Sequence, residues 1–401
     1  MRLPLSFGRL VASNLLAQSA EQVALAAVPI VAVLALGAGP GETGLLAGLQ
    51  TLPFLLLSLP LGLVADRVAR RKLMAGAELV RAAALAGVPL LAAGGLVSVP
   101  VLAALGFVAA TGTVAYSVAA PSLVPALVPR AALGLANGRL ELVRSIAFAS
   151  GPALAGALVG WAGASLAFLL AVALSLGAAG CLSGLQEPTR EPAARRSVLH
   201  DLREGAAFAW RHRLLRPILL TAVAWNVSWF VLQAVYMPYA LTGLGLSSAE
   251  VGATLGAYGV GMVLGALLAP RLGRSLRFGS MVATGPFVSV AAALAMLGSL
   301  AVPGPVMPAL SFLLFGAGPI VWTISQTTLR QAVTPEAMLG RVSALITMAT
   351  FGARPIGAAI GGVVGAAFGP APCLVLAALG FAVQAAVIAA SPVPALRAIP
   401  A

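Results

Sequence analysis

The segment Gly62-Leu63-Val64-Ala65-Asp66-Arg67-Val68-Ala69-Arg70-Arg71-Lys72 joins two apolar runs, residues 44–65 and 73–94. Each run is long enough to cross a bilayer, which takes about 20 apolar residues. The segment holds an Asp-Arg pair followed by three more basic residues, and basic loops stay on the cytoplasmic side of a membrane. It therefore predicts a helical hairpin in a membrane with a cytoplasmic loop.

The rest of the chain repeats this pattern. Ten further apolar runs have the length of a span: 10–36, 99–120, 141–160, 164–185, 217–241, 249–270, 279–301, 306–328, 343–367 and 369–391. Of the 401 residues, 60% are apolar and 9% are charged, whereas soluble domains have about 25% charged residues. The short alternating strands of a membrane barrel do not occur. The sequence predicts an all-α membrane protein with twelve transmembrane helices.

The basic residues predict the orientation of these helices. Of the 24 Lys and Arg residues, 21 lie at the chain ends or on alternate loops, and the other three (Arg81, Arg144 and Arg354) lie within apolar runs. The opposite loops have none, so we expect both termini in the cytoplasm and a multi-pass protein of the cell inner membrane. Because the basic residues form short separate clusters, the net charge of +13 does not indicate a nucleic-acid partner. Glu21 interrupts the first run, which predicts an uncleaved span and not a signal peptide.

The chain also contains an internal repeat. Three residues of the first half, Pro129, Gly138 and Pro152, recur about half a chain later as Pro335, Gly340 and Pro355. Such repeats are typical of two related bundles with a path between them. We expect an N-terminal six-helix bundle (1–185), a cytoplasmic linker (186–216) and a C-terminal six-helix bundle (217–401). The linker carries both histidines, His200 and His212, and its stretch Ser197–Arg213 predicts an amphipathic helix on the cytoplasmic membrane surface.

The loop quoted above resembles the signature loop of the major facilitator superfamily, with Ala69 where the family usually has Gly. Short segments are similar to its drug and siderophore exporters, the enterobactin and macrolide efflux type: Ser13-Asn14-Leu15, Glu21–Leu25, Leu52-Pro53-Phe54, Pro121–Pro129, Leu244–Gly252 and Leu339–Val342. The resemblance implies a secondary transporter that works by alternating access and is not an enzyme.

Partners and cofactors follow from the same comparison of motifs. No phosphate-binding loop, nucleophile elbow or zinc-protease helix occurs, which predicts no cofactor, no metal and no ATP hydrolysis. The expected partners are a small-molecule substrate, protons and membrane lipids, and we expect a monomer. The predicted function is proton-coupled export of amphipathic drugs or secreted metabolites such as siderophores. An importer or a lipid or lysolipid flippase on the same fold is the alternative.

The stretch Gly151–Gly160 resembles the Gly-Pro motif in the fifth helix of antiporters of this superfamily. We assign Gly151, Pro152 and Gly156 to it, and Gly156 begins a GxxxG pair that permits close helix contact. Ordinary packing of small residues is the other interpretation. Residues 99–120 lack the Arg that drug antiporters often carry in helix 4.

Charges within the membrane are the candidates for coupling and gating. Glu21 is the predicted proton-coupling group; the alternative is a protonated Glu that bonds Gln18 or a backbone carbonyl. The loop resemblance implies a cytoplasmic gate, to which we assign six residues: Gly62, Asp66, Arg67, Arg71, Glu78 and Arg81. Glu78 and Arg81 are spaced to form an ion pair on one helix face. Asp66 is expected to pair with an Arg or to meet a helix N-terminus.

Polar and aromatic residues predict a substrate cavity. Asn226, Trp229 and Gln233 share one helical face. The other candidates are Asn14, Gln18, Trp322, Gln326 and Arg354. Helix packing and an interfacial aromatic belt are the alternative for the aromatic residues. Arg354 is a counter-ion for Glu21, a partner of a substrate carboxylate, or a residue paired within the C-terminal half.

Overall fold

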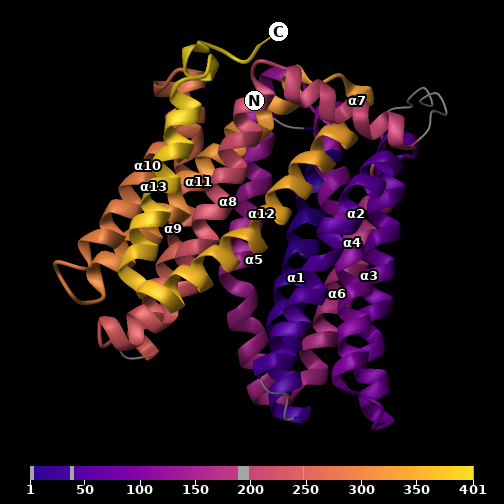
Figure 1. Cartoon of the computed structure of the whole chain (residues 1–401). Coiled ribbons are helices and arrows are strands. Elements are labelled where there is room, and N and C mark those ends of the chain that lie inside the picture. The colour runs from indigo at the N-terminus through magenta and orange to yellow at the C-terminus, as the bar shows by residue number, and fades with distance from the viewer. Residues whose placement is uncertain (1–3, 37–39, 188–197, 247, 401) are drawn as a thin grey trace. The chain divides into compact units, whose positions relative to one another are not determined.

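The computed structural model of the protein describes residues 4–36, 40–187, 198–246 and 248–400, and within these ranges every regular element is a helix (Figure 1). The long helices of the first half are α1 (Leu5–Leu36), α2 (Pro40–Arg67), α3 (Arg70–Ala93), α4 (Val99–Leu127), α5 (Leu133–Ala162) and α6 (Ala164–Ser183). After α7 (Val198–Arg211) come α8 (Leu215–Pro238), α9 (Ser248–Ser275), α10 (Phe278–Gly298), α11 (Val306–Val333), α12 (Leu339–Phe368) and α13 (Pro370–Ala389). The shorter turns are η1 (Arg130–Ala132), η2 (Tyr239–Gly243), η3 (Glu336–Met338) and η4 (Val393–Ala395).

The long helices coincide with the twelve predicted spans. Among the described residues, eleven helices are long and apolar enough to cross a membrane. The helix over the twelfth predicted run is α1, which is continuous for 32 residues. The polar residues of α1 include Asn14, Gln18, Glu21 and Gln22, all in the first two thirds of the helix. The predicted all-α membrane fold is confirmed.

Several helices extend beyond their predicted runs. α4 continues to Leu127, seven residues beyond the predicted run, with Pro121 and Pro125 inside its last turns. Proline is tolerated there because neighbouring groups in a membrane protein bond the backbone atoms that it frees. The predicted amphipathic segment Ser197–Arg213 forms α7, whereas residues 188–197 of the predicted linker lie outside the described residues.

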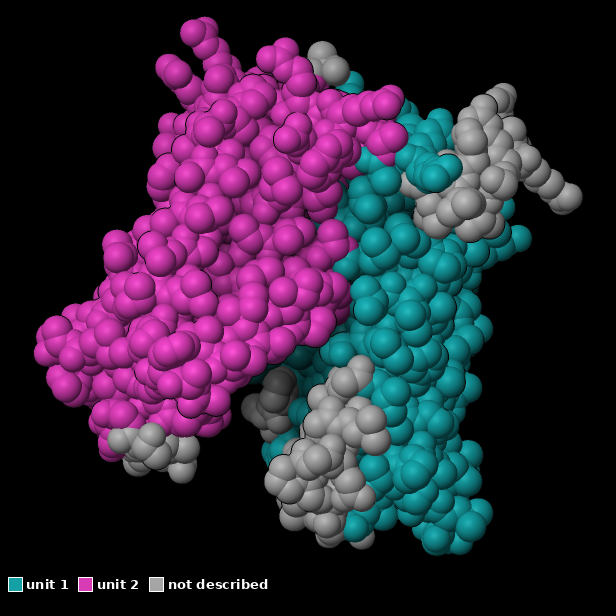
Figure 2. All heavy atoms as spheres, viewed as in Figure 1, with its two compact units in different colours: residues 1–206, 334–348 teal, residues 207–333, 349–401 magenta. Residues whose placement is uncertain are grey.

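The chain forms two compact units, residues 1–206 with 334–348 and residues 207–333 with 349–401 (Figure 2). In the first unit, α1 packs against α5 and α6, α2 against α4, and α3 against α4 and α6. In the second, α8 packs against α13, α9 against α11, and α10 against α11 and α13. The second set of pairs corresponds to the first, as expected for a repeat. The start of α12 belongs to the first unit, and the predicted bounds of the two bundles and the linker remain predictions.

Candidate functional site

Asp66 lies in the last turn of α2 and is 3% exposed. Its Oδ1 accepts a hydrogen bond from the Gly340 backbone N–H at 2.9 Å, and its Oδ2 accepts one from the Arg341 N–H at 3.0 Å. These N–H groups lie in the first turn of α12, where a helix has no acceptors of its own. The carboxylate therefore caps α12 and faces the positive end of its dipole.

Two glycines permit this contact. A Cβ at Gly340 would lie 2.6 Å from the Gly62 carbonyl oxygen, and a Cβ at Gly62 would lie 2.9 Å from the Gly340 carbonyl oxygen. Both distances are shorter than real Cβ contacts, so α2 and α12 meet backbone to backbone. This explains in physical terms why the motif has glycine at position 62.

Charged side chains surround the cap. The Arg341 Nε lies 3.5 Å from Asp66 Oδ2, and Nη1 of the same guanidinium donates to the Glu204 carboxylate of α7 at 3.1 Å. Arg70, which is 1% exposed, donates to the Glu336 carbonyl at 3.2 Å and lies 3.6 Å from the Glu336 carboxylate. We call these five residues the Asp66 cluster. They connect α2, α3, α7 and η3 with the start of α12.

A second carboxylate caps α3. Glu187 accepts hydrogen bonds from the backbone N–H groups of Arg70 at 3.1 Å and Arg71 at 3.0 Å. The Arg71 guanidinium donates to the Leu185 carbonyl at 2.9 Å, just beyond the end of α6. Of the predicted gate residues in this loop, Gly62, Asp66 and Arg71 thus have defined contacts, and Arg67 is exposed.

The loop resemblance missed four of these partners: Arg70, Glu187, Glu204 and Glu336. The fifth partner, Arg341, was indicated by the internal repeat, because Gly340-Arg341 repeats Gly138-Arg139.

Glu78 and Arg81 form the expected ion pair inside the first unit, with 3.1 Å between their charged atoms. Glu78 is 0% and Arg81 2% exposed. Arg81 also donates to the Ala17 carbonyl of α1 and to the Thr113 hydroxyl of α4, both at 2.9 Å. The pair thus connects three helices. The similar pair Glu141–Arg144 on α5, at 2.8 Å, is only partly buried. Participation of Glu78 and Arg81 in the gate stays a prediction.

Glu21 is half-buried on α1, and its charge acts on Glu78. One turn away lies Gln18, also half-buried, and Asn14 donates from α1 to the Leu140 carbonyl of α5 at 3.2 Å. Gly151 of α5 packs directly on Gln22, the neighbour of Glu21. The Gly-Pro motif therefore contacts α1 at the residue next to the predicted coupling residue.

The remaining motif residues contribute less to this contact. Gly156 is exposed, and a Cβ there would meet no described atom within 4 Å, so the close contact expected at this glycine is absent from the described structure. The side chain of Pro152 lies outside the described residues.

In the second unit, Arg354 of α12 donates from its Nε to the Asn226 amide oxygen of α8 at 3.2 Å. Its guanidinium lies 3.7 Å from the centre of the Phe351 ring and 5.6 Å from that of Phe230. Asn226 is held in turn by its own hydrogen bond to the Ala222 carbonyl at 2.9 Å. Arg354 thus has partners in its own unit, which was one of the three alternatives.

Trp229 is 8% exposed and lies in a group of rings. Its centroid is 5.3 Å from Trp225, 5.1 Å from Phe315 and 5.9 Å from Phe312. Gln233, on the same helix, is half-buried. These ring contacts are what the alternative interpretation, helix packing by aromatic residues, leads us to expect. The assignment of Trp229 and Gln233 to a substrate cavity stays a prediction.

The two candidates on α11 differ in their surroundings. Trp322 is half-buried and packs on an apolar cluster that includes Ile218 and Leu329. The amide nitrogen of Gln326 donates to the Thr327 hydroxyl at 2.9 Å, while its buried amide oxygen has no hydrogen-bond partner among the described residues. Gln326 therefore has an acceptor available for a further donor.

These helices and buried charges define a polytopic α-helical membrane protein with two repeated units. The sequence profile of the Major Facilitator Superfamily matches residues 10–358. The chain therefore belongs to the Major Facilitator Superfamily, is a transporter of small-molecule substrates and is not an enzyme. The predicted family resemblance is confirmed.

Relatives with assigned names include efflux proteins. The multidrug efflux pump Tap of Mycobacterium bovis is 28% identical over 371 residues, which cover 87% of this chain and 84% of Tap. The enterobactin exporter EntS of Shigella boydii is 29% identical over 65% of this chain and 61% of EntS. An uncharacterized MFS-type transporter, y4rN of Sinorhizobium fredii, is 34% identical over 61% of this chain. The matched region spans only 60% of the y4rN protein.

The fold is similar to that of solved transporters. The crystal structure of a bacterial homologue of the iron transporter ferroportin, in an outward-facing state, matches with a TM-score of 0.78 and 20% identity over 97% of this chain and 99% of that chain. At this identity the similarity supports the fold alone.

Proposed function

We propose that the chain is a proton-coupled exporter of amphipathic small molecules that works by alternating access. It acts as a monomer in the cell inner membrane with both termini in the cytoplasm. The distribution of basic residues supports this orientation. The names of Tap and EntS support export, because one is called a multidrug efflux pump and the other an enterobactin exporter.

The observation that carries proton coupling is the setting of Glu21. Carboxylates within a bilayer are costly and mark proton pathways. Glu78 of α3 and Glu141 of α5 form ion pairs with Arg81 and Arg144 at 3.1 and 2.8 Å. Glu21 is half-buried and its charge acts on Glu78, which is fully buried. A proton from water therefore reaches Glu21 more easily than Glu78.

The contact of α5 with α1 supplies a route from protonation to movement. Gly151 leaves no space between the α5 backbone and Gln22, so a shift of α1 at Glu21 is transmitted to the Gly-Pro motif. A protonated Glu21 loses its repulsion from Glu78, and a deprotonated Glu21 regains it. Protonation therefore shifts the conformational equilibrium to the extent that this repulsion differs between the two conformations.

The test is transport by purified protein in proteoliposomes under an imposed pH gradient, with ethidium as a fluorescent amphipathic cation. Wild type is expected to move ethidium in proportion to the gradient, and Glu21→Gln to equilibrate it without dependence on the gradient. Glu141→Gln is the matched control, since it removes a second partly buried carboxylate, on α5, by the same substitution. Unaltered proton dependence in Glu21→Gln would show that the coupling residue is assigned wrongly. Transport in the direction of import, or none for a panel of amphipathic cations and anions, would contradict export.

A further inference from the structure

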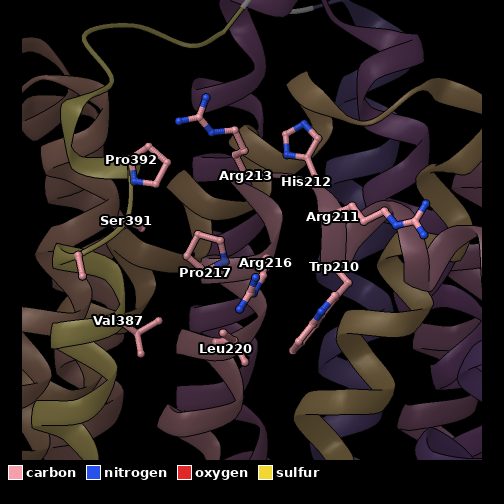
Figure 3. Close-up of a pocket in the computed structure, with 11 residues that line it drawn as sticks. Trp210, Arg211, His212, Arg213, Arg216, Pro217, Leu220, Val387, Ser391 and Pro392 are labelled. Atoms are coloured by element: carbon pink, nitrogen blue, oxygen red, sulfur yellow. The ribbon is translucent and has the colours of Figure 1, made fainter.

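A pocket of about 560 Å³ lies within the second unit, outside the region assigned to transport. Its walls come from the end of α7, the first turns of α8, and the last turn of α13 with the residues after it (Figure 3). The spanning segments of α8 and α13 run over Leu215–Pro238 and Pro370–Ala389. The pocket is thus lined by the ends of two spans, at the level where the boundary between hydrocarbon and headgroups is expected.

The two ends of the pocket differ in chemistry. Figure 3 places Arg213 and His212 in the upper part of the view, and Leu220 and Val387 in the lower part. Leu220 lies one turn further into α8 than Arg216, and Val387 lies within α13, so both apolar side chains belong to the membrane-embedded side. The pocket is therefore basic toward water and apolar toward the bilayer interior, and Figure 3 shows the Arg216 side chain between the two ends, just above Leu220.

The basic end is suited to a phosphate. Three arginines line the pocket, Arg211, Arg213 and Arg216, and no Asp or Glu is among the lining residues. Guanidinium groups bind phosphate oxygens through two parallel hydrogen bonds, which lysine cannot do. All three arginines are exposed, so an incoming anion can reach them without breaking a buried ion pair.

His212 and Trp210 add two features of an interfacial anion site. The His212 Nδ1 accepts a hydrogen bond from the Leu214 backbone N–H at 3.2 Å, which leaves Nε2 to carry the proton and to donate. Burial lowers the pKa of His212, so this neutral form prevails at pH 7. The Arg216 guanidinium lies 4.9 Å from the centre of the Trp210 ring. Tryptophan is enriched at the level of the headgroups.

We propose that this pocket binds the phosphate group of an anionic phospholipid, with Arg213 and Arg216 on the phosphate and the start of an acyl chain along Leu220 and Val387. Basic pockets between helix ends bind such headgroups in other membrane proteins. The ligand holds the turn between α7 and α8 against the end of α13. This proposal does not depend on the direction of transport. A phosphorylated solute without a tail shares the anion but cannot use the apolar end.

The experiment uses the full-length protein in phosphatidylcholine nanodiscs and short-chain phosphatidylglycerol as the probe. Thermal stability and native mass spectrometry give its dissociation constant. The double variant Arg213→Gln/Arg216→Gln is expected to weaken binding at least tenfold. Arg274→Gln removes one exposed arginine at the end of α9 in the same unit, and is expected to change binding less than twofold.

Two further arms make the result decisive. Arg216→Lys keeps the charge and removes the planar fork, so it is expected to weaken binding several-fold even if the double variant fails to fold. Inorganic phosphate is expected to compete at least a hundredfold less well than phosphatidylglycerol. If Arg274→Gln weakens binding as much as Arg216→Lys, the attraction is general to the basic surface and the proposal is wrong. Equal competition by inorganic phosphate would also overturn it, because the ligand would then be a soluble anion.

Discussion

Replacing Asp66 by Asn tests whether one carboxylate fastens the start of α12 to α2. The substitution keeps the size of the side chain and removes its charge. The amide oxygen still accepts one of the two N–H groups, Gly340 or Arg341, while the amide nitrogen faces the other and cannot accept it. Arg341, 3.5 Å away, loses its buried partner Asp66, while its ion pair with the partly exposed Glu204 remains.

The magnitude follows from these contacts. A hydrogen bond to a charged group contributes about 1.5–3 kcal/mol. In the Asp66→Asn variant one of the two hydrogen bonds is lost and the other no longer has a charged acceptor. We therefore expect the free energy needed to separate α12 from α2 to fall by roughly 2–4 kcal/mol. Since 1.4 kcal/mol is a factor of ten, the open population rises by about 30- to 700-fold.

Cysteine labelling measures this opening. Ser343, one turn into α12, is 2% exposed, and a Ser343→Cys reporter in a chain with Cys181 and Cys373 replaced by Ala is labelled only when α12 moves away from its packing. The labelling rate follows the open population when closing is faster than the reaction. The control Glu204→Gln removes a 39% exposed partner of Arg341, and exposed ion pairs contribute about 0–1 kcal/mol. A labelling rate for Asp66→Asn within twofold of that for Glu204→Gln would refute the reasoning.

Two further predictions concern stability in detergent. Arg81→Gln leaves Glu78 buried without a counter-charge, so it should lower the free energy of unfolding by about 3–5 kcal/mol. The control Arg144→Gln breaks a partly exposed pair of the same spacing and should lower it by about 1 kcal/mol or less. Denaturant titrations measure both losses, and equal losses would contradict the burial of the Glu78–Arg81 pair. Gly340→Ala puts a Cβ 2.6 Å from a carbonyl oxygen and should lower Tm, whereas Gly134→Ala, in open space on α5, should leave Tm unchanged or raise it. A normal Tm for Gly340→Ala would argue against the close contact of α2 with α12.

The hydrophobic pattern predicted the helices well and their ends less well. The runs at 73–94 and 164–185 correspond to α3 (Arg70–Ala93) and α6 (Ala164–Ser183). α11 continues to Val333, five residues past the predicted end, because Arg330 and Gln331 are buried although they are polar. A hydropathy pattern treats such residues as the end of a span. Their burial depends on neighbouring helices, which the sequence does not reveal.

For each contact of the candidate site, the sequence predicted one residue but not the residue that it contacts. The loop motif identified Asp66, but its partner Gly340 lies 274 residues further along the chain. The internal repeat marked Gly340-Arg341 without indicating what they touch. Similarly, helical spacing placed Asn226 and Trp229 on one face. It did not distinguish a cavity wall from the ring cluster in which Trp229 packs.

The two capping carboxylates suggest why charge gathers around this loop. α3 begins after Ala69, and α12 begins after Met338. Neither side chain has an oxygen atom that could accept a hydrogen bond from the first N–H groups of its helix. These N–H groups are bonded instead by Glu187 and Asp66, side chains from other segments. A cap supplied by a helix's own neighbour moves with that helix. A cap supplied from elsewhere lasts only while the two segments stay together, so its loss adds to the free-energy cost of separating them. This is the physical property that a gate at the Asp66 cluster requires, and it explains why the charge of Asp66, more than its size, should set the labelling rate at Ser343→Cys.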